Sequence, residues 1–207
     1  MSLCRIVEQT TNNRFFGGLY LMDFWAQAIG IVAMAFNITA FQFKSKRALL
    51  LFICVGSSLF SVNLFMLGAV TGGLMNILSA VRSLVYVNKD KLPISVKLIN
   101  AMFISAYLIS YVLSFTVFGT EPSARNLILE LLPIIAMIAM TIAFAGSNSK
   151  IIRLSGFISS PCWLTYNIFN NAIGGIICEV FILVSIISAL IRIDILGKKE
   201  EEKKKIS

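Results

Sequence analysis

The chain contains seven long apolar stretches, separated by short polar or glycine-containing segments. Each stretch is about 20 residues long, which is the length that a helix needs to cross the hydrocarbon core of a bilayer. In lipid the backbone polar groups must be paired within the segment, and a helix does this. The sequence therefore predicts an all-α integral membrane protein, with seven transmembrane helices over residues 24–43, 49–67, 70–87, 98–118, 127–145, 151–169 and 172–193.

The composition excludes a soluble domain. Of the 207 residues, 57% are hydrophobic and only 14% are charged, whereas soluble domains carry about 25% charged residues. The formal net charge is +8, but the basic residues flank apolar segments and form no patch with interleaved aromatic residues, so nucleic acid is not an expected partner. The expected partner is the lipid bilayer.

Residue types also limit the chemistry. The chain has no histidine, and none of its four cysteines forms a C-x-x-C pair, so neither a cofactor nor a metal site is expected. A Ser-Lys catalytic dyad would need Lys46 or Lys150, and both lie at span ends near water. We therefore expect no enzymatic activity and no catalytic residue.

The basic residues indicate a topology. Lysine and arginine are expected in cytoplasmic loops, and they follow the first, third, fifth and seventh spans. This predicts a multi-pass protein with the N-terminus outside and the C-terminus in the cytoplasm. Residues 1–21 are polar and predict an exposed leader, while residues 197–207 predict a charged cytoplasmic tail that is attracted to anionic headgroups.

A weak internal repeat divides the chain. Ser45-Lys46 and Asn63 recur as Ser149-Lys150 and Asn167, an offset of 104 residues, and Gly72-Gly73 recurs as Gly174-Gly175 at an offset of 102. Duplicated helix blocks with a site between them are common in transporters. We expect a 3+1+3 parallel repeat, with three-helix blocks at residues 22–90 and 125–196 joined by a linker helix within 91–124.

Two asparagines mark a candidate substrate site. Asn63 and Asn167 lie at matching depths in the second and sixth spans, and a carboxamide in hydrocarbon must face protein. Either they bind a ligand across a central cavity, or they bridge helices for a gain of about 1 kcal/mol. Trp163 lies one turn before Asn167, where it either offers a stacking plane to a ligand or packs in the core.

An acidic residue inside the last apolar span is the other strong candidate. Intramembrane carboxylates are costly, so we expect Glu179 to bind a substrate or cation, or to couple transport to protons; a structural ion pair, with Arg82 as a candidate partner, is the alternative. Asn76 corresponds to Glu179 at an offset of 103 and completes the candidate site. Glu130 is expected in the first turn of the fifth span, where it complements the helix N-terminus.

Short motifs in both halves resemble a known family, the YgjV-type inner-membrane proteins of bacteria. The resemblance covers residues 27–194 and rests on Phe41-Gln42, Lys46-Arg47, Ser57-Ser58-Leu59-Phe60, Asn63, Leu67-Gly68-Ala69, Met75-Asn76, Arg82, the run Pro161-Cys162-Trp163-Leu164-Thr165-Tyr166-Asn167, and Glu179. More distantly, the three-one-three plan is similar to the SWEET, PQ-loop and PnuC-type transporters, which implies passage of sugars, amino acids or vitamin precursors. The family resemblance implies a bacterial inner membrane as the location.

These observations favour a transporter or facilitator for a small polar metabolite. A membrane receptor or scaffold that does not transport is the alternative, since a fold alone does not define a function. Because the repeat is internal, either a monomer or a homodimer is compatible with a complete pathway.

Overall fold

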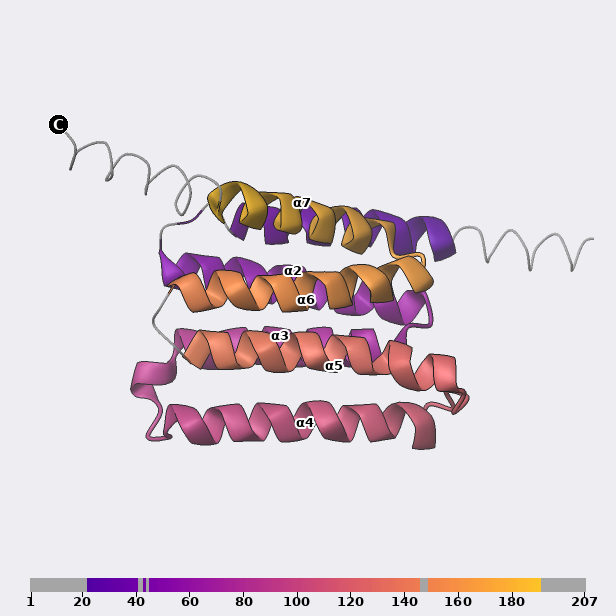
Figure 1. Cartoon of the computed structure of the whole chain (residues 1–207), viewed down its shortest axis with the longest axis horizontal. Coiled ribbons are helices and arrows are strands. Elements are labelled where there is room, and N and C mark those ends of the chain that lie inside the picture. Colours follow the sequence, from indigo (N-terminus) through magenta and orange to yellow (C-terminus); the bar gives the residue numbers. More distant parts are fainter. Residues whose placement is uncertain (1–21, 41–42, 44, 146–148, 191–207) are drawn as a thin grey trace, which may run out of the picture.

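The computed structural model describes residues 22–40, 43, 45–145 and 149–190, and within these ranges the chain is helical with no β-strand. The predicted leader and tail lie outside the described residues. The helices are the N-terminal helix Met22–Ala40, α2 Lys46–Met66, α3 Val70–Val87, the 3-10 helix η1 Lys89–Lys91, α4 Val96–Thr116, α5 Ala124–Ala145, α6 Ser149–Phe169 and α7 Ile173–Leu190 (Figure 1).

Five of the described helices are long and apolar enough to cross a bilayer, namely Met22–Ala40 and the helices α2 to α5. The apolar part described for α7, Ile173–Ile187, is shorter. The outer face of α4 exposes large apolar side chains, such as Met102, Ile109 and Val112, which lipid would cover. The predicted all-α membrane architecture is therefore confirmed, while seven crossings remain a prediction.

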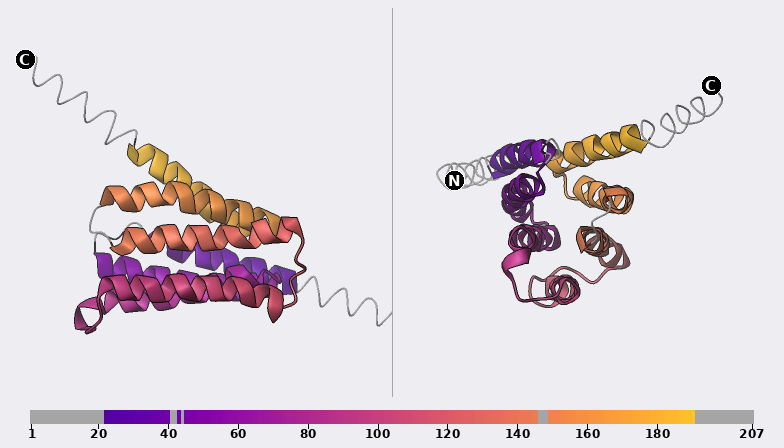
Figure 2. Two further views of the ribbon diagram at one scale, coloured as in Figure 1. Left: turned by 60° about the horizontal axis from the view of Figure 1, so that its bottom comes forward. Right: turned by 90° about the vertical axis from the view of Figure 1, so that its left-hand side faces the viewer.

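Consecutive helices run antiparallel (Figure 1), and they lie next to one another, as the end-on view in Figure 2 shows. Helix α2 lies between the N-terminal helix and α3, α6 lies between α5 and α7, and α4 packs against both α3 and α5. The ring closes where the N-terminal helix meets α7. A Cβ on Gly174 would overlap the backbone of Gly30, so the absence of a side chain at Gly174 permits this close approach.

Two tight turns have the same geometry. Gly68 (φ 76°) and Asn171 (φ 53°) both adopt the left-handed conformation. Ala69 N–H donates to the carbonyl of Leu64 at 2.8 Å, and Ala172 N–H donates to that of Asn167 at 2.9 Å, which is the bonding of a Schellman turn. Both turns fall in the gaps that the predicted spans leave, between residues 67 and 70 and between residues 169 and 172. The two turns match at an offset of 103 residues. At this offset Asn167 corresponds to Leu64, and Tyr166 corresponds to Asn63.

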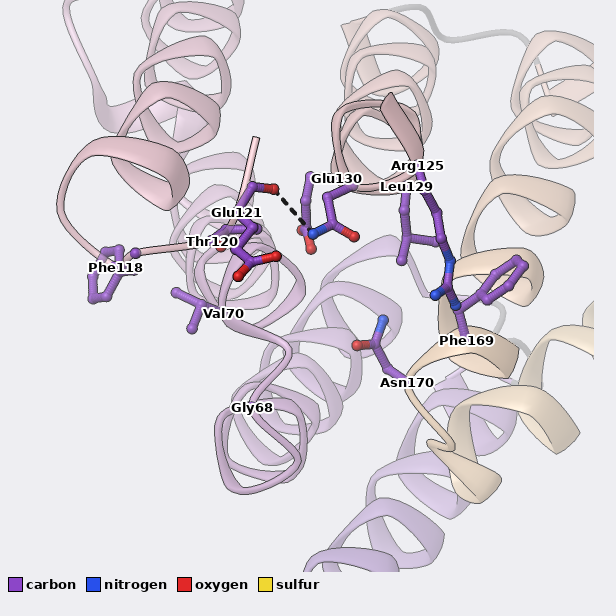
Figure 3. A pocket seen from close by; sticks show the side chains of 12 residues that line it. Gly68, Val70, Phe118, Thr120, Glu121, Arg125, Leu129, Glu130, Phe169 and Asn170 are labelled. Carbon is purple, nitrogen blue, oxygen red and sulfur yellow. Dashed lines mark hydrogen bonds between the residues drawn. The ribbon is translucent and has the colours of Figure 1, made fainter. Parts of the chain in front are cut away.

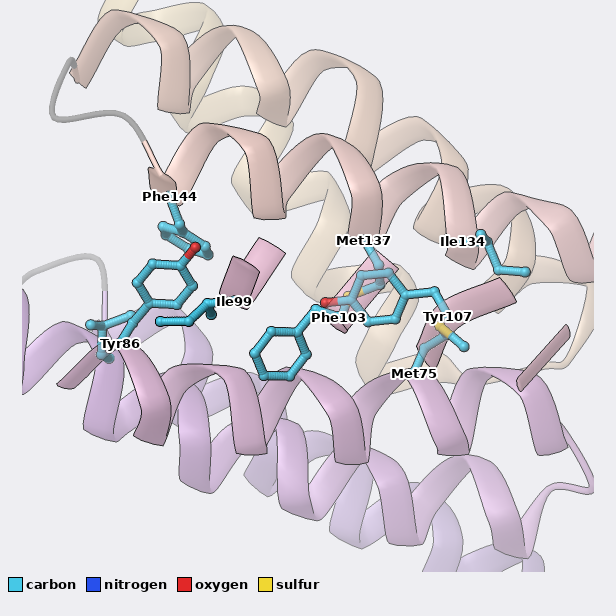
Figure 4. Close-up of a cluster of buried hydrophobic side chains, with 9 residues drawn as sticks. Met75, Tyr86, Ile99, Phe103, Tyr107, Ile134, Met137 and Phe144 are labelled. Carbon is cyan, nitrogen blue, oxygen red and sulfur yellow. The ribbon is translucent and has the colours of Figure 1, made fainter. Parts of the chain in front are cut away.

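The main core lies between α3, α4 and α5. It contains Tyr86 and Met75 from α3, Phe103 and Tyr107 from α4, and Phe144 among others from α5 (Figure 4). A second cluster joins Leu64 of α2 to Tyr166 of α6, and Trp163 packs against both clusters.

Candidate functional site

A pocket of about 460 Å³ opens at the end of the bundle that carries the α2–α3, α4–α5 and α6–α7 connections. Its rim includes exposed Glu121 and Arg125, and the Arg125 guanidinium lies 5.0 Å from the centroid of the Phe169 ring (Figure 3). The pocket is lined by Gly68, Val70, Phe118, Gly119, Thr120, Glu121, Arg125, Asn126, Leu129, Glu130, Phe169 and Asn170.

A buried carboxylate lies at this pocket. Glu130 of α5 is only 8% exposed. Tyr166 of α6 donates its hydroxyl to Glu130 Oε2 at 3.3 Å, and the Thr71 side chain of α3 lies beside the carboxylate. The pocket therefore reaches a contact between α3, which precedes α4 in the chain, and α5 and α6, which follow it.

The N-terminus of α3 explains how this carboxylate is accommodated. Gly72 N–H is one of the first-turn donors that lack a partner within the helix, and it donates to the Tyr166 hydroxyl at 2.9 Å. A negative charge near a helix N-terminus is stabilised by the helix dipole. Glu130 was expected in the first turn of its own helix, but α5 begins at Ala124 and has no acidic residue in its first turn. That prediction was wrong, because the helix starts earlier than its apolar run.

Polar side chains continue from Glu130 into the core along the buried face of α4. Thr71 is hydrogen-bonded to Ser114, and Ser114, Ser110 and Tyr107 follow one another on that face. The Tyr107 hydroxyl lies 3.0 Å from the Thr141 hydroxyl of α5. From Ser114 to Tyr107 this row extends about 10 Å along the helix.

The row ends at a buried arginine. Arg82 of α3 is 3% exposed, and its Nη1 donates to Thr141 Oγ1 at 2.8 Å, to the Met137 carbonyl at 3.3 Å and to the Tyr107 hydroxyl at 3.4 Å. Its guanidinium carbon lies 5.1 Å from the centroid of the Phe144 ring. The predicted pairing of Arg82 with Glu179 is not observed: Arg82 makes the contacts above, and Glu179 lies beside Ser160 of α6.

The predicted site residue Asn63 bridges two helices. It is fully buried, and its Nδ2 donates to the Ala26 carbonyl of the N-terminal helix at 2.7 Å. Its Oδ1 has no hydrogen-bond partner among the described residues. A Cβ on Gly30 would lie 3.0 Å from Asn63 Nδ2, so this glycine makes room for the amide.

The other two asparagines also lie within helix contacts. Asn76 donates to the Gly72 carbonyl of its own helix at 3.0 Å. Asn167 is 5% exposed and packs against Gly175 of α7, where a Cβ would collide with the amide. Both arrangements are compatible with a structural role.

The two remaining predicted site residues, Trp163 and Glu179, lie on α6 and α7. Trp163 is half-buried and contacts Tyr166 edge-on, with ring centroids 6.0 Å apart. Glu179 is half-buried beside α6. None of the five predicted site residues lines the pocket described above. Among the described residues no cluster of metal-ligating side chains was found.

The sequence analysis missed the Glu130–Tyr166–Thr71 contact, although a signal existed. At the offset of 103, Glu130 corresponds to Gln27. Gln27 lies in the N-terminal helix and binds the start of α7: its Oε1 accepts from Ile173 N–H at 3.0 Å and its Nε2 donates to the Asn171 carbonyl at 2.8 Å. Glu130 likewise contacts the start of α3 through Thr71.

Apolar helices with lipid-facing outer surfaces and polar side chains in the interior define an integral membrane protein. The model of the Imp-YgjV family, described as bacterial inner membrane protein, matches residues 24–196, and the chain belongs to this family. The chain is also similar to inner membrane protein YgjV of Escherichia coli (strain K12), with 29% identity over 157 residues that cover 75% of this chain and 78% of that protein. No solved structure matches.

The predicted resemblance to the YgjV-type family is confirmed. The more distant likeness to the SWEET, PQ-loop and PnuC-type transporters stays a prediction.

Proposed function

We propose that the protein is a transporter or facilitator for a small polar metabolite of the sugar, amino acid or vitamin-precursor class. The observation that carries the proposal is the pocket that reaches buried Glu130 where α3 meets α5 and α6. Ligand sites in membrane proteins lie between helices at such contacts. A buried carboxylate that faces a pocket is a functional candidate, because placing it in the membrane is costly.

The proposal includes the 3+1+3 parallel repeat, with α4 as the linker. Helices α2 and α6 run in the same direction, as do α3 and α7 (Figure 1). Gln27 and Glu130, which match at the offset of 103, each contact the start of a helix in the other block. Parallel repeats are related by an axis along the membrane normal, and this pair of contacts supports such an axis.

The proposed route runs from the pocket through the polar row to Arg82. Beyond Arg82 the aromatic side chains of Tyr86, Phe103 and Phe144 fill the core (Figure 4). In this conformation the pocket end is open and the opposite end is closed, so transport requires these aromatic residues to separate. The predicted orientation, with the N-terminus outside, places the open end on the outer side of the inner membrane.

Trp163 belongs to the same proposed site, since it packs beside Tyr166 and against both core clusters. For Asn63, Asn76, Asn167 and Glu179 a substrate-binding role also remains part of the proposal. Glu179→Gln tests coupling to protons: equal uptake rates and pH profiles in this variant and the wild type would exclude it.

A membrane receptor or scaffold is the alternative function. The observation that favours it is the packing of Asn63 and Asn167 against glycines of neighbouring helices, which accounts for both amides without a ligand.

Uptake of a metabolite mixture tests the proposal. Cells that express the wild type, Glu130→Gln or no protein are given sugars, amino acids, nucleosides and vitamin precursors, and intracellular levels are measured by mass spectrometry. At least one compound should accumulate faster with the wild type, and Glu130→Gln should lower that rate by about tenfold, as loss of a hydrogen-bonded charge of about 1.5 kcal/mol would. Asp23→Asn, at the exposed start of the N-terminal helix, is the control. If no compound accumulates faster than in cells without the protein, the transport proposal fails.

A further inference from the structure

Arg82 carries a buried charge without a counterion among the side chains that the structure describes. It is 3% exposed, and the groups around it are hydroxyls, a carbonyl and an aromatic ring. A buried charge without a partner is strongly unfavourable, so such groups are normally paired. The surroundings of Arg82 supply dipoles but no negative charge.

The part of this guanidinium that lacks strong hydrogen bonds is the edge formed by Nε and Nη2. Nη1 is saturated by three acceptors, and the guanidinium carbon lies over the Phe144 ring. By contrast, Nε has no hydrogen-bond partner among the described residues, and Nη2 makes only a 3.4 Å contact with the Ser79 hydroxyl. Nε and Nη2 together form the side-on edge that binds a carboxylate through two parallel hydrogen bonds.

A third donor lies at the same edge. The Ser79 hydroxyl accepts from Ser57 at 3.1 Å and from Arg82 Nη2, so both of its lone pairs are engaged and its own proton is left to donate. Ser57 and Ser79 are 3% and 7% exposed. Two guanidinium N–H groups and one O–H group therefore lie together in a buried place.

We propose that this edge binds the carboxylate of the transported metabolite, which makes the substrate a small monocarboxylate or a zwitterion with one carboxylate. One guanidinium and one carboxylate form a neutral pair, whereas a doubly charged phosphate would leave a buried negative charge. The inference rests on the proposed transport function. It adds the chemical class of the transported molecule and the residue that recognises it.

Formate is the probe, because it is the smallest carboxylate and enters any site that holds this group. Full-length protein in detergent is unfolded thermally in sodium formate and in sodium chloride of equal concentration. A ligand that binds only the folded state raises the unfolding midpoint, and we expect a rise of about 3 °C in formate over chloride at ten times its dissociation constant. Formamide, which is uncharged, should give no rise.

Arg82→Lys keeps the charge but loses the two-donor edge, and it should abolish the response to formate. Arg47→Lys, the same change at an exposed position at the start of α2, should keep it. The inference is overturned if the wild type responds equally to formate and chloride, or if Arg82→Lys responds as the wild type does. The comparison of formate with chloride uses only the wild type, so an equal response to the two salts overturns the inference even if Arg82→Lys does not fold.

The outcomes separate this inference from the proposed function. A response to formate that requires Arg82, without uptake of any metabolite, supports the anion site and contradicts the transport proposal. Uptake of a metabolite by a wild-type protein that does not respond to formate supports the transport proposal and contradicts the anion site.

Discussion

Asparagine and glycine pair across helix contacts at three places among the residues that the structure describes. Asn37 packs on Gly56, Asn63 on Gly30, and Asn167 on Gly175. In each case a Cβ on the glycine would crowd the amide. Membrane helices approach closely at small residues, and polar side chains then bridge them. An intramembrane asparagine in this chain therefore has a packing role that its sequence position alone does not reveal.

Asn167→Ala decides between the two roles of its amide. If Asn167 is a bridge, the variant unfolds at a lower temperature in the absence of ligand, with a loss of about 1 kcal/mol, and uptake in cells stays near the wild-type rate. If Asn167 binds the substrate, stability is nearly unchanged, and a ligand found in a thermal-shift screen no longer stabilises the variant. The arrangement against Gly175 predicts the first result.

Gly72→Ala should disturb the contact between α3 and α6. The new methyl group would collide with the Tyr166 ring, which must move away from Gly72 N–H and from Glu130. Forced overpacking of this kind costs about 1–3 kcal/mol, to be read from thermal unfolding in detergent. Gly156→Ala is the matched control, because its methyl group meets only the flexible end of the Ile186 side chain. Equal losses in the two variants would contradict this account of Gly72.

At the scale of elements, the two matching turns differ in the residue that holds the left-handed conformation. No atom lies within 4 Å of the place that a Cβ on Gly68 would occupy. Gly68→Ala therefore tests the backbone conformation alone, and it should lower the free energy of unfolding by about 1 kcal/mol. Asn171→Gly should be neutral within about 0.5 kcal/mol, because asparagine tolerates this conformation. Thermal unfolding of both variants checks the prediction, and a neutral Gly68→Ala would show that the turn relaxes.

Helix positions could be predicted from the sequence because apolar runs of bilayer length have one solution for their backbone hydrogen bonds. The turns at Gly68 and Asn171 followed from the same length limit. Helix starts could not be predicted as well, since α5 begins at Ala124, before its apolar run. Glu130 therefore does not lie in the first turn of α5, and its buried side chain contacts the start of α3 instead.

The candidate site at Glu130 is formed by contacts between segments that are distant in the chain, and a single sequence does not predict such contacts. Tyr166 was part of a quoted motif, yet nothing in its spacing indicated that its hydroxyl meets Gly72 and Glu130. The offset of 104 taken from Asn63 and Asn167 concealed the match between Gln27 and Glu130, which appears at the offset of 103 that the two turns share with Asn76 and Glu179. Arg82 was named as a candidate partner of Glu179, but its partners lie on α4 and α5.

At the scale of the whole molecule, the topology is open to a direct test. Ser123 lies in the α4–α5 connection and Lys91 in η1, at opposite ends of the bundle (Figure 1). With the native cysteines replaced, Ser123→Cys should react with an impermeant thiol reagent added to intact spheroplasts, and Lys91→Cys should react only after the membrane is opened. The reverse pattern would contradict the predicted orientation.

The central claim is that small molecules pass from the pocket to the polar row, and substituted-cysteine labelling at Ser110 tests it without knowledge of the substrate. In a cysteine-free background, Ser110→Cys should react with 2-sulfonatoethyl methanethiosulfonate, a small anionic reagent, applied from the pocket side. Ser58→Cys, at an exposed serine of α2, should not react, because the reagent does not enter lipid. If Ser110→Cys remains unmodified from both sides while Ser123→Cys reacts, the row is a sealed core and the account of a transport route is contradicted.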